Sequence, residues 1–163
     1  SSTDSAWLAA EMGLPYAFAG HFAPDMMVHA FQIYRENYKP SEKFPESYAI
    51  ACVNGIAAET DEEAKKLSTT LYQAFLNIIR NDRKPYSPPV EDIDEIWNPM
   101  EKAHVLKMLH YSFIGSEETI QSKLTSFQEA FQVDELMITS HIYDEQARLK
   151  SYEIIKTAVD GMI

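Results

Sequence analysis

The chain has 163 residues, of which 45% are hydrophobic and 24% charged, a composition typical of one soluble globular domain with a hydrophobic core. Its formal net charge of −11 argues against a nucleic-acid partner, because phosphate backbones require clustered Lys and Arg. No apolar run reaches the roughly 18–20 residues that span a bilayer, so no membrane partner is expected. The single cysteine, Cys52, favours a cytoplasmic location and is predicted to be buried.

The N-terminal stretch Ser1-Ser2-Thr3-Asp4-Ser5 precedes an amphipathic run that ends at Gly13. This pattern predicts a capped helix over about residues 5–12. A helix N-terminus also carries free N–H groups and a partial positive charge, which makes it a candidate anion site. Spacing alone favours an ordinary capped helix over a binding site. Because the chain does not begin with Met, we also expect further sequence before Ser1.

Apolar runs and capping signals divide the rest of the chain into alternating strands and helices. Nearly continuous apolar runs predict strands that are buried on both faces, with a bulge or turn at Asn54-Gly55. The Pro-rich, acidic part of the segment 82–113 is interpreted either as a lid or as a solvated connector. The predicted strands cover 16–22, 48–57 and 133–141, and the predicted helices cover 24–38, 60–80, 98–111, 116–131 and 144–160.

This alternation predicts a single α/β domain, residues 1–163, with a parallel sheet and an insertion at about 82–113. Parallel β/α arrays bind ligands at the carboxyl ends of their strands. His21 and His141 have no partner at metal-ligand spacing, so no metal site is predicted. The residues that the pattern places at this edge are Ser1, Ser2, Gly20, His21, Asn54, Gly55, Thr139, Ser140 and His141.

Four segments in order resemble the bacterial luciferase-like monooxygenases, most closely the alkanal-monooxygenase-like, single-chain, FMN-linked subgroup. The first is the Ser1–Pro15 stretch, which resembles the flavin-phosphate segment of that family and continues through Pro24. The others are Thr60-Asp61-Glu62-Glu63-Ala64, the stretch from Phe113 to Thr119, and the stretch from Asp134 to His141. The resemblance covers essentially the whole chain.

The resemblance implies that the chain is the C-terminal half of a (β/α)8 TIM barrel. It implies a monooxygenase that uses reduced FMN, supplied by a flavin reductase, and O2 to oxidise an aldehyde or a similar small organic substrate. By the same resemblance, the backbone N–H groups of Ser1 and Ser2 and the hydroxyl of Ser5 hold the FMN phosphate. Gly20 and His21 are expected near the flavin ring.

The family's catalytic residues lie in its N-terminal half, so no catalytic residue is assigned here and this chain alone is expected to be inactive. Its expected protein partner is that half or a second copy, as in a homo-oligomer such as a dimer. Two alternatives remain open: a non-catalytic flavin-binding or interaction protein on the same fold, and a deazaflavin-dependent oxidoreductase.

Overall fold

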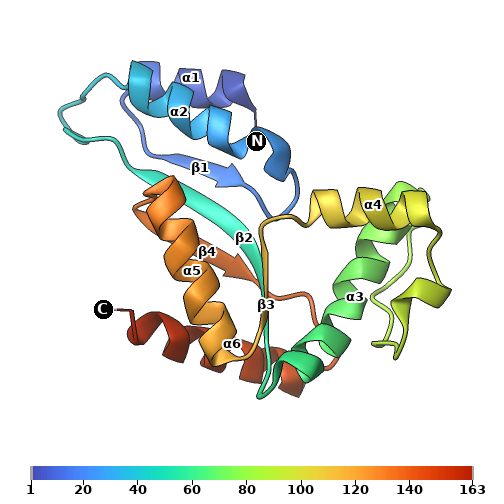
Figure 1. Cartoon of the computed structure of the whole chain (residues 1–163). Helices are drawn as coiled ribbons and strands as arrows, with labels where there is room; N and C mark the ends of the chain where they lie inside the picture. The colour runs from blue at the N-terminus through green and yellow to red at the C-terminus, as the bar shows by residue number, and fades with distance from the viewer. Residues whose placement is uncertain (1, 163) are drawn as a thin grey trace.

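The computed structural model describes residues 2–162, which form a four-stranded parallel sheet flanked by helices (Figure 1). Ser1, one of the predicted site residues, lies outside the described residues. No helix within residues 2–162 is long and apolar enough to cross a membrane. The strands are β1 (Tyr16–Ala19), β2 (Ala49–Ala57), β3 (Ser112–Gly115) and β4 (Glu135–Thr139); the helices are α1 (Thr3–Glu11), α2 (Met27–Asn37), α3 (Asp61–Ile79), α4 (Pro99–Met108), α5 (Glu117–Phe131) and α6 (Glu145–Asp160), with short 3-10 turns η1 (Pro24–Met26) and η2 (Ile93–Glu95).

Strand β2 is the centre of the sheet because it pairs with all three other strands. Cys52 is paired with both β1 and β4, so these two strands lie on opposite edges of β2. Asn54 is paired with both β3 and β4, so β3 also lies opposite β4. Strands β1 and β3 therefore follow each other along one edge of β2, and β4 occupies the other edge.

One face of this sheet packs against helices. Phe18, Ala51 and Ile138 share that face by register, and they join a core cluster with residues of α1, α2, α5 and α6. The opposite face is only partly covered, since Ala17 is exposed and Met137 is 52% exposed. The prediction that every strand is buried on both faces is therefore wrong for β1 and β4, and it holds only for β2.

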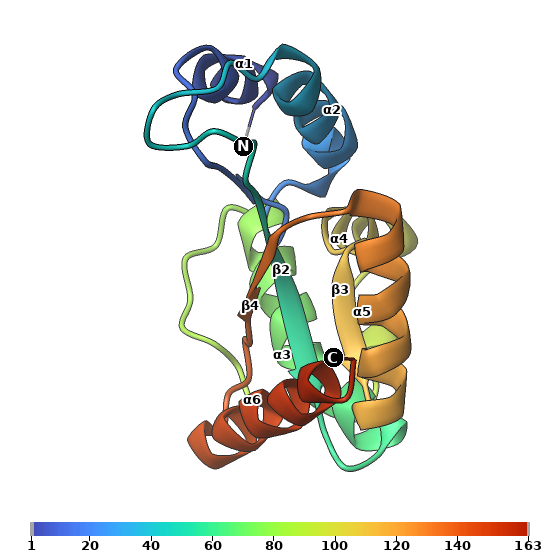
Figure 2. The same ribbon diagram turned by 90° about the vertical axis from the view of Figure 1, so that its left-hand side faces the viewer.

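The helices form where capping and apolar spacing predict them. Thr60 caps α3 by accepting a hydrogen bond from the Glu63 N–H, and the apolar stripe of α5 is buried throughout. In α3 the apolar stripe of the sequence is longer than the buried face of the helix, because Ile78 at its end is 51% exposed. In Figure 2, α1 and α2 pack together above the sheet, while α5 and α6 lie against its lower part.

Three local predictions are wrong. The Asn54-Gly55 pair forms no turn and lies inside β2, where both residues pair with β3. A fourth strand, β3, begins at Ser112, where the sequence pattern suggested only the end of a helix and its insertion. Apolar spacing predicts that Ala103, Leu106 and Leu109 face inward, but Ala103 is exposed and Leu106 is 42% exposed; α4 buries Val105 instead, and only Leu109, its C-cap residue, is buried as predicted.

Helix α4 is tied to α3 by an ion pair between Arg80 and Glu101. The Arg80 Nε and Nη2 atoms donate to the two carboxylate oxygens of Glu101 at 2.7 and 2.9 Å, and Glu101 also accepts from the Asn98 N–H at 2.9 Å. These hydrogen bonds, with that from Arg80 first, lower the pKa of Glu101 to about 2. The same contacts fix the start of α4 and the end of the segment that precedes it.

We expect α4 to loosen in acid through Glu101. Because folding lowers the pKa of this carboxyl, its contribution is complete above the ordinary pKa of 4.5 and is lost as the pH falls through about 2. Hydrogen exchange of the α4 amides between pH 5 and pH 2, as rough limits of that window, measures this loss. In Glu101→Gln the protection, taken as the measured rate relative to the intrinsic rate at each pH, should be lower at pH 5 and should change much less with pH. Wild-type protection that stays constant down to pH 2 would contradict the assignment.

The close packing of α6 on β2 requires glycine at position 55. A Cβ atom there would lie 2.5 Å from Ile138 Cγ2 and 2.9 Å from Ile155 Cδ1. We expect Gly55→Ala to lower the free energy of unfolding by about 1–3 kcal/mol in urea denaturation, because these branched side chains must shift. Gly161→Ala is the control, since its Cβ would meet only the flexible end of Gln121, and it should change stability by less than about 0.5 kcal/mol.

Candidate functional site

The carboxyl edge of the sheet is held together by the buried side chain of Asn54. Its Nδ2 donates to the backbone carbonyl of His21 at 2.8 Å, and its Oδ1 accepts from the Thr139 hydroxyl at 3.3 Å. The His21 N–H in turn donates to the Cys52 carbonyl at 2.6 Å. Asn54 stands where the partner of β2 changes from β1 to β3, so its amide connects the end of β1 with the end of β4.

Glycine at position 20 allows β1 to leave β2 at this point. A Cβ on Gly20 would lie 2.7 Å from the Met27 sulfur and 3.0 Å from the Cys52 carbonyl oxygen. The chain can therefore turn only if this residue has no side chain. The turn brings His21 and Phe22 to the carboxyl edge, where the sequence predicted His21 to lie.

The N-terminus of α1 is closed by a reciprocal capping box. Ser2 Oγ accepts from the Ser5 N–H at 3.2 Å, while Ser5 Oγ accepts from the Ser2 N–H at 3.4 Å and donates to the Ser2 carbonyl at 2.9 Å. The Tyr16 hydroxyl also donates to that carbonyl, at 3.0 Å. Helix geometry then leaves the N–H groups of Thr3 and Asp4 without an intrahelical acceptor.

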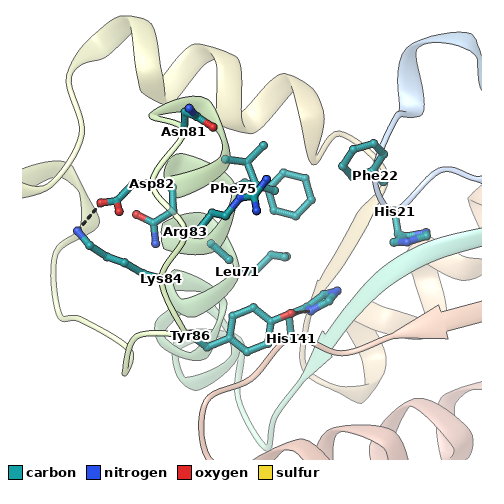
Figure 3. Close-up of a pocket in the computed structure, with 13 residues that line it drawn as sticks. His21, Phe22, Leu71, Phe75, Asn81, Asp82, Arg83, Lys84, Tyr86 and His141 are labelled. Carbon is teal, nitrogen blue, oxygen red and sulfur yellow. Dashed lines mark hydrogen bonds and ion pairs between the residues drawn. The ribbon is translucent and has the colours of Figure 1, made fainter.

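A cavity of about 520 Å³ opens beside this edge, between α3 and the segment after β1 (Figure 3). Its size is in the range of small-molecule sites. Its apolar wall comes from α3, and His21 and Phe22 line the other side. The loop after α3, which includes Arg83, Lys84 and Tyr86, closes the rest.

The polar end of the cavity is a pair formed by Tyr86 and His141. The Tyr86 hydroxyl lies 2.5 Å from His141 Nδ1, and the two rings meet edge to face with their centroids 5.5 Å apart. Burial, with a smaller effect of neighbouring His21, lowers the pKa of His141, and burial raises the pKa of Tyr86. Both groups are therefore mainly neutral at pH 7.

His21 faces the same cavity. Burial lowers the pKa of its imidazole, so that ring is also mainly neutral at pH 7. Its Nδ1 atom is shielded from solvent and makes no hydrogen bond to any residue in the range 2–162.

The structure thus gathers His21, Asn54, Thr139 and His141 at one edge, as the strand pattern predicted. Gly55 does not belong to this group, because it lies inside β2 beneath α6. Tyr86 was missed: it lies in a Pro-rich loop, and no periodic pattern relates it to a strand end. Cys52 is buried, and burial raises the pKa of its thiol. Within residues 2–162, no three His, Cys, Asp or Glu side chains are grouped as a metal site.

Together, the parallel sheet, the helix N-terminus and the cavity at its carboxyl edge define an α/β protein of the class that binds small ligands at strand ends. No family model matches the chain. The chain is 41% identical to a luciferase-like monooxygenase of Escherichia coli strain K12 over 154 residues, which are 94% of this chain and 46% of that protein. It is 44% identical to YvbT of Bacillus subtilis over 155 residues, or 95% of this chain and 46% of YvbT.

Solved structures agree with these sequence comparisons. The crystal structure of apo-MsnO8 covers 98% of this chain with a TM-score of 0.82 and 27% identity, and the match covers 49% of that protein. The oxygenating constituent of 3,6-diketocamphane monooxygenase of Pseudomonas putida, solved with FMN, covers 98% of this chain with a TM-score of 0.57. At 19% identity, this second likeness shows the fold alone, over 45% of that protein.

The predicted resemblance is confirmed: the chain is similar to a luciferase-like monooxygenase over nearly its whole length. It spans about half the length of the curated relatives that it matches.

We expect Asn54→Asp to destabilise the carboxyl edge, because a carboxylate cannot donate to the His21 carbonyl. The unfolding free energy should fall little while the new carboxyl is neutral, because its O–H can still donate to that carbonyl, and by about 1–3 kcal/mol or more once it is charged. Burial raises the folded pKa of the new carboxyl above its unfolded value, so the folded state binds the extra proton and stability should decrease as the pH rises. Urea denaturation at several pH values measures both effects.

Thr139→Val provides the comparison, since it removes only the long hydroxyl contacts and leaves the Asn54 amide in place. It should have a smaller effect that does not change with pH. An Asn54→Asp protein with unchanged stability would show that this amide does not hold the edge together.

Proposed function

We propose that this chain is the FMN-binding part of a flavin-dependent monooxygenase that oxidises an aldehyde or a similar small organic substrate with O2. The observation that carries the proposal is the sequence similarity to a luciferase-like monooxygenase across 94% of the chain. The site supports it, because a helix N-terminus and a cavity of suitable size lie at the carboxyl edge of one sheet. We further propose that the sheet is the C-terminal half of a (β/α)8 barrel.

The N-terminus of α1 fits the phosphate group of FMN. Of the two predicted N–H donors, that of Ser1 lies outside the described residues and that of Ser2 donates to Ser5 Oγ at 3.4 Å. We therefore extend the proposal to the N–H groups of Thr3 and Asp4 in the first turn, which can donate to phosphate oxygens where the helix dipole favours negative charge. The Ser5 hydroxyl, which the family resemblance assigns to the phosphate, here donates to the Ser2 carbonyl and would have to rotate to make that contact. The carboxylate of Asp4 in the same turn opposes the phosphate charge.

The bound flavin would supply the oxygen-activating redox chemistry, and this chain would hold and enclose it. Gly20 and His21 remain the predicted neighbours of the flavin ring, since the turn at Gly20 brings the backbone to the same edge. The flavin reductase, the cytoplasmic location and the association with an N-terminal half or a second copy also stay predictions, and no catalytic residue is assigned.

Product formation distinguishes an enzyme from a flavin-binding protein without turnover. With FMN, a flavin reductase, NADH, O2 and a long-chain aldehyde, the full-length protein should form the carboxylic acid in proportion to the aldehyde added, whereas reduced FMN that reacts with O2 alone gives only hydrogen peroxide. Tight FMN binding with hydrogen peroxide and no acid would favour the non-catalytic alternative. The absorbance spectrum of the cofactor released on denaturation separates FMN from a deazaflavin.

Replacement of Thr3 by proline tests the phosphate assignment. Proline is favoured at the first position of a helix, and the preceding residue, Ser2, already has the extended φ and ψ of −145° and 161° that proline requires. Thr3→Pro therefore removes one N–H donor while it preserves the helix. We expect FMN to bind about tenfold more weakly or worse in a fluorescence titration, because a hydrogen bond to a charged group contributes roughly 1.5–3 kcal/mol.

Two variants control this measurement. Thr3→Ala keeps the N–H and should bind FMN with nearly wild-type affinity. Glu117→Pro makes the same change at the first position of α5, where Ser116 is also extended, and should leave FMN affinity unchanged. Wild-type affinity in Thr3→Pro would refute the phosphate assignment, whereas equal losses in both proline variants would indicate a general effect on folding.

A further inference from the structure

The Tyr86–His141 pair is the polar group of the cavity that the sequence and the family resemblance leave without a role. Tyr86 comes from the loop after α3, and His141 follows β4, so the contact joins segments 55 residues apart. Around it, Phe22 and most of the α3 wall are apolar, with Leu71, Phe75 and Ile78 on the α3 side and Asn77 as the one polar residue of α3 in the lining. Figure 3 shows the Tyr86 hydroxyl directed at the His141 ring, with His21 on the opposite side of the cavity from α3.

The contact determines which nitrogen of His141 carries its proton. Either group can donate or accept, but the phenol O–H is the more acidic donor and the unprotonated imidazole nitrogen is the more basic acceptor. The favoured arrangement therefore has Tyr86 donating to Nδ1 of His141, and the imidazole then carries its hydrogen on Nε2. The edge-to-face packing of the two rings restricts rotation of the imidazole. Tyr86 thus turns His141 into an oriented hydrogen-bond donor.

We propose that Tyr86 is a positioning residue that fixes the tautomer of His141, and that the His141 Nε2–H binds the acceptor oxygen of a neutral ligand whose apolar body lies on the α3 wall. The proposal rests on the proposed function in one respect only, which is that this ligand would be the substrate of the proposed enzyme. It adds to that function a named donor and a selectivity for neutral over anionic ligands.

The preference for a neutral ligand follows from the groups around the pair. Neither imidazole supplies a positive charge, and Lys84 at the rim is already paired with Asp82. A carboxylate placed against the apolar α3 wall would lose its hydration without a cation in contact to replace it. A ketone or aldehyde oxygen loses much less hydration and still accepts the hydrogen bond. Arg83 is the other cation at the rim, and because a cation attracts anions, the test must include an anionic ligand.

The first experiment measures the tautomer directly. In protein labelled with ¹⁵N on histidine and free of flavin, the His141 ring nitrogens should give the signals of a protonated Nε2 and an unprotonated Nδ1 at pH 7.5. Tyr86→Phe keeps the ring and removes the donor, so the two signals should move toward the averages of a tautomer mixture. A protonated Nδ1 in the wild type, or unchanged signals in Tyr86→Phe, would overturn the proposal.

The second experiment measures ligand choice by chemical-shift titration with acetophenone, ethylbenzene and benzoate. Acetophenone should bind roughly 3- to 10-fold more tightly than ethylbenzene, as expected for one net hydrogen bond, and more tightly than benzoate. Tyr86→Phe and His141→Ala should remove the advantage of acetophenone over ethylbenzene. His141→Gln, whose amide N–H₂ can reach a similar position, should restore part of it. Tighter binding of benzoate, or equal affinity of acetophenone for the wild type and Tyr86→Phe, would contradict the proposal.

Tyr143→Phe is the matched control, because Tyr143 is an exposed tyrosine that does not line the cavity. It should leave both the His141 signals and the affinities unchanged. Since neither experiment contains flavin, their outcome is independent of FMN binding. Thr3→Pro should weaken FMN without affecting acetophenone, so a failure of the phosphate assignment and a failure of the His141 assignment give different results.

Discussion

The arrangement of this molecule depends on the double pairing of strand β2. Because β4 occupies one edge of β2 at residues 50–54, β1 and β3 share the other edge, and each pairs with only part of it. The change of partner would leave backbone groups without hydrogen bonds inside the sheet, and the Asn54 amide and the His21 N–H provide these bonds. The same junction turns the chain out of β1 and places His21 at the carboxyl edge. The residues that complete the hydrogen bonds of the sheet therefore also position the candidate site.

The sequence predicted most helices because their signals are local. Capping residues lie within four positions of the amides that they bind, and an apolar stripe such as that of α5 needs only one buried surface. Strand β3 escaped prediction because Ser112–Gly115 is too short for a periodic pattern and directly follows α4. Its pairing depends on the free edge that β1 leaves on β2, which is a property of the assembled sheet.

The candidate site also has one part that the sequence predicts and one part that it does not. His21, Asn54 and His141 could be predicted at one edge, since strand order alone brings the carboxyl ends of parallel strands together. The cavity could not, because it forms where the exposed end of the α3 stripe meets the loop that contains Tyr86. Ile78 illustrates the difference: its spacing fits the core, yet half of its side chain is exposed at the cavity wall. A residue that fits an apolar stripe but is left uncovered is a signal of a binding surface, and only the structure reveals it.

The N-terminus of α1 and the cavity, which lie at the same edge, differ in their electrostatics. The chain carries a net charge of −11, so an anion approaches it against the overall field and must be held by local groups. The N-terminus of α1 supplies such groups as oriented N–H dipoles, which need no positive side chain. The cavity supplies neutral donors in an apolar wall, where an unpaired anion is disfavoured. The two proposed ligands, a phosphate and a neutral oxygen-bearing molecule, would therefore not compete for the same groups at this edge.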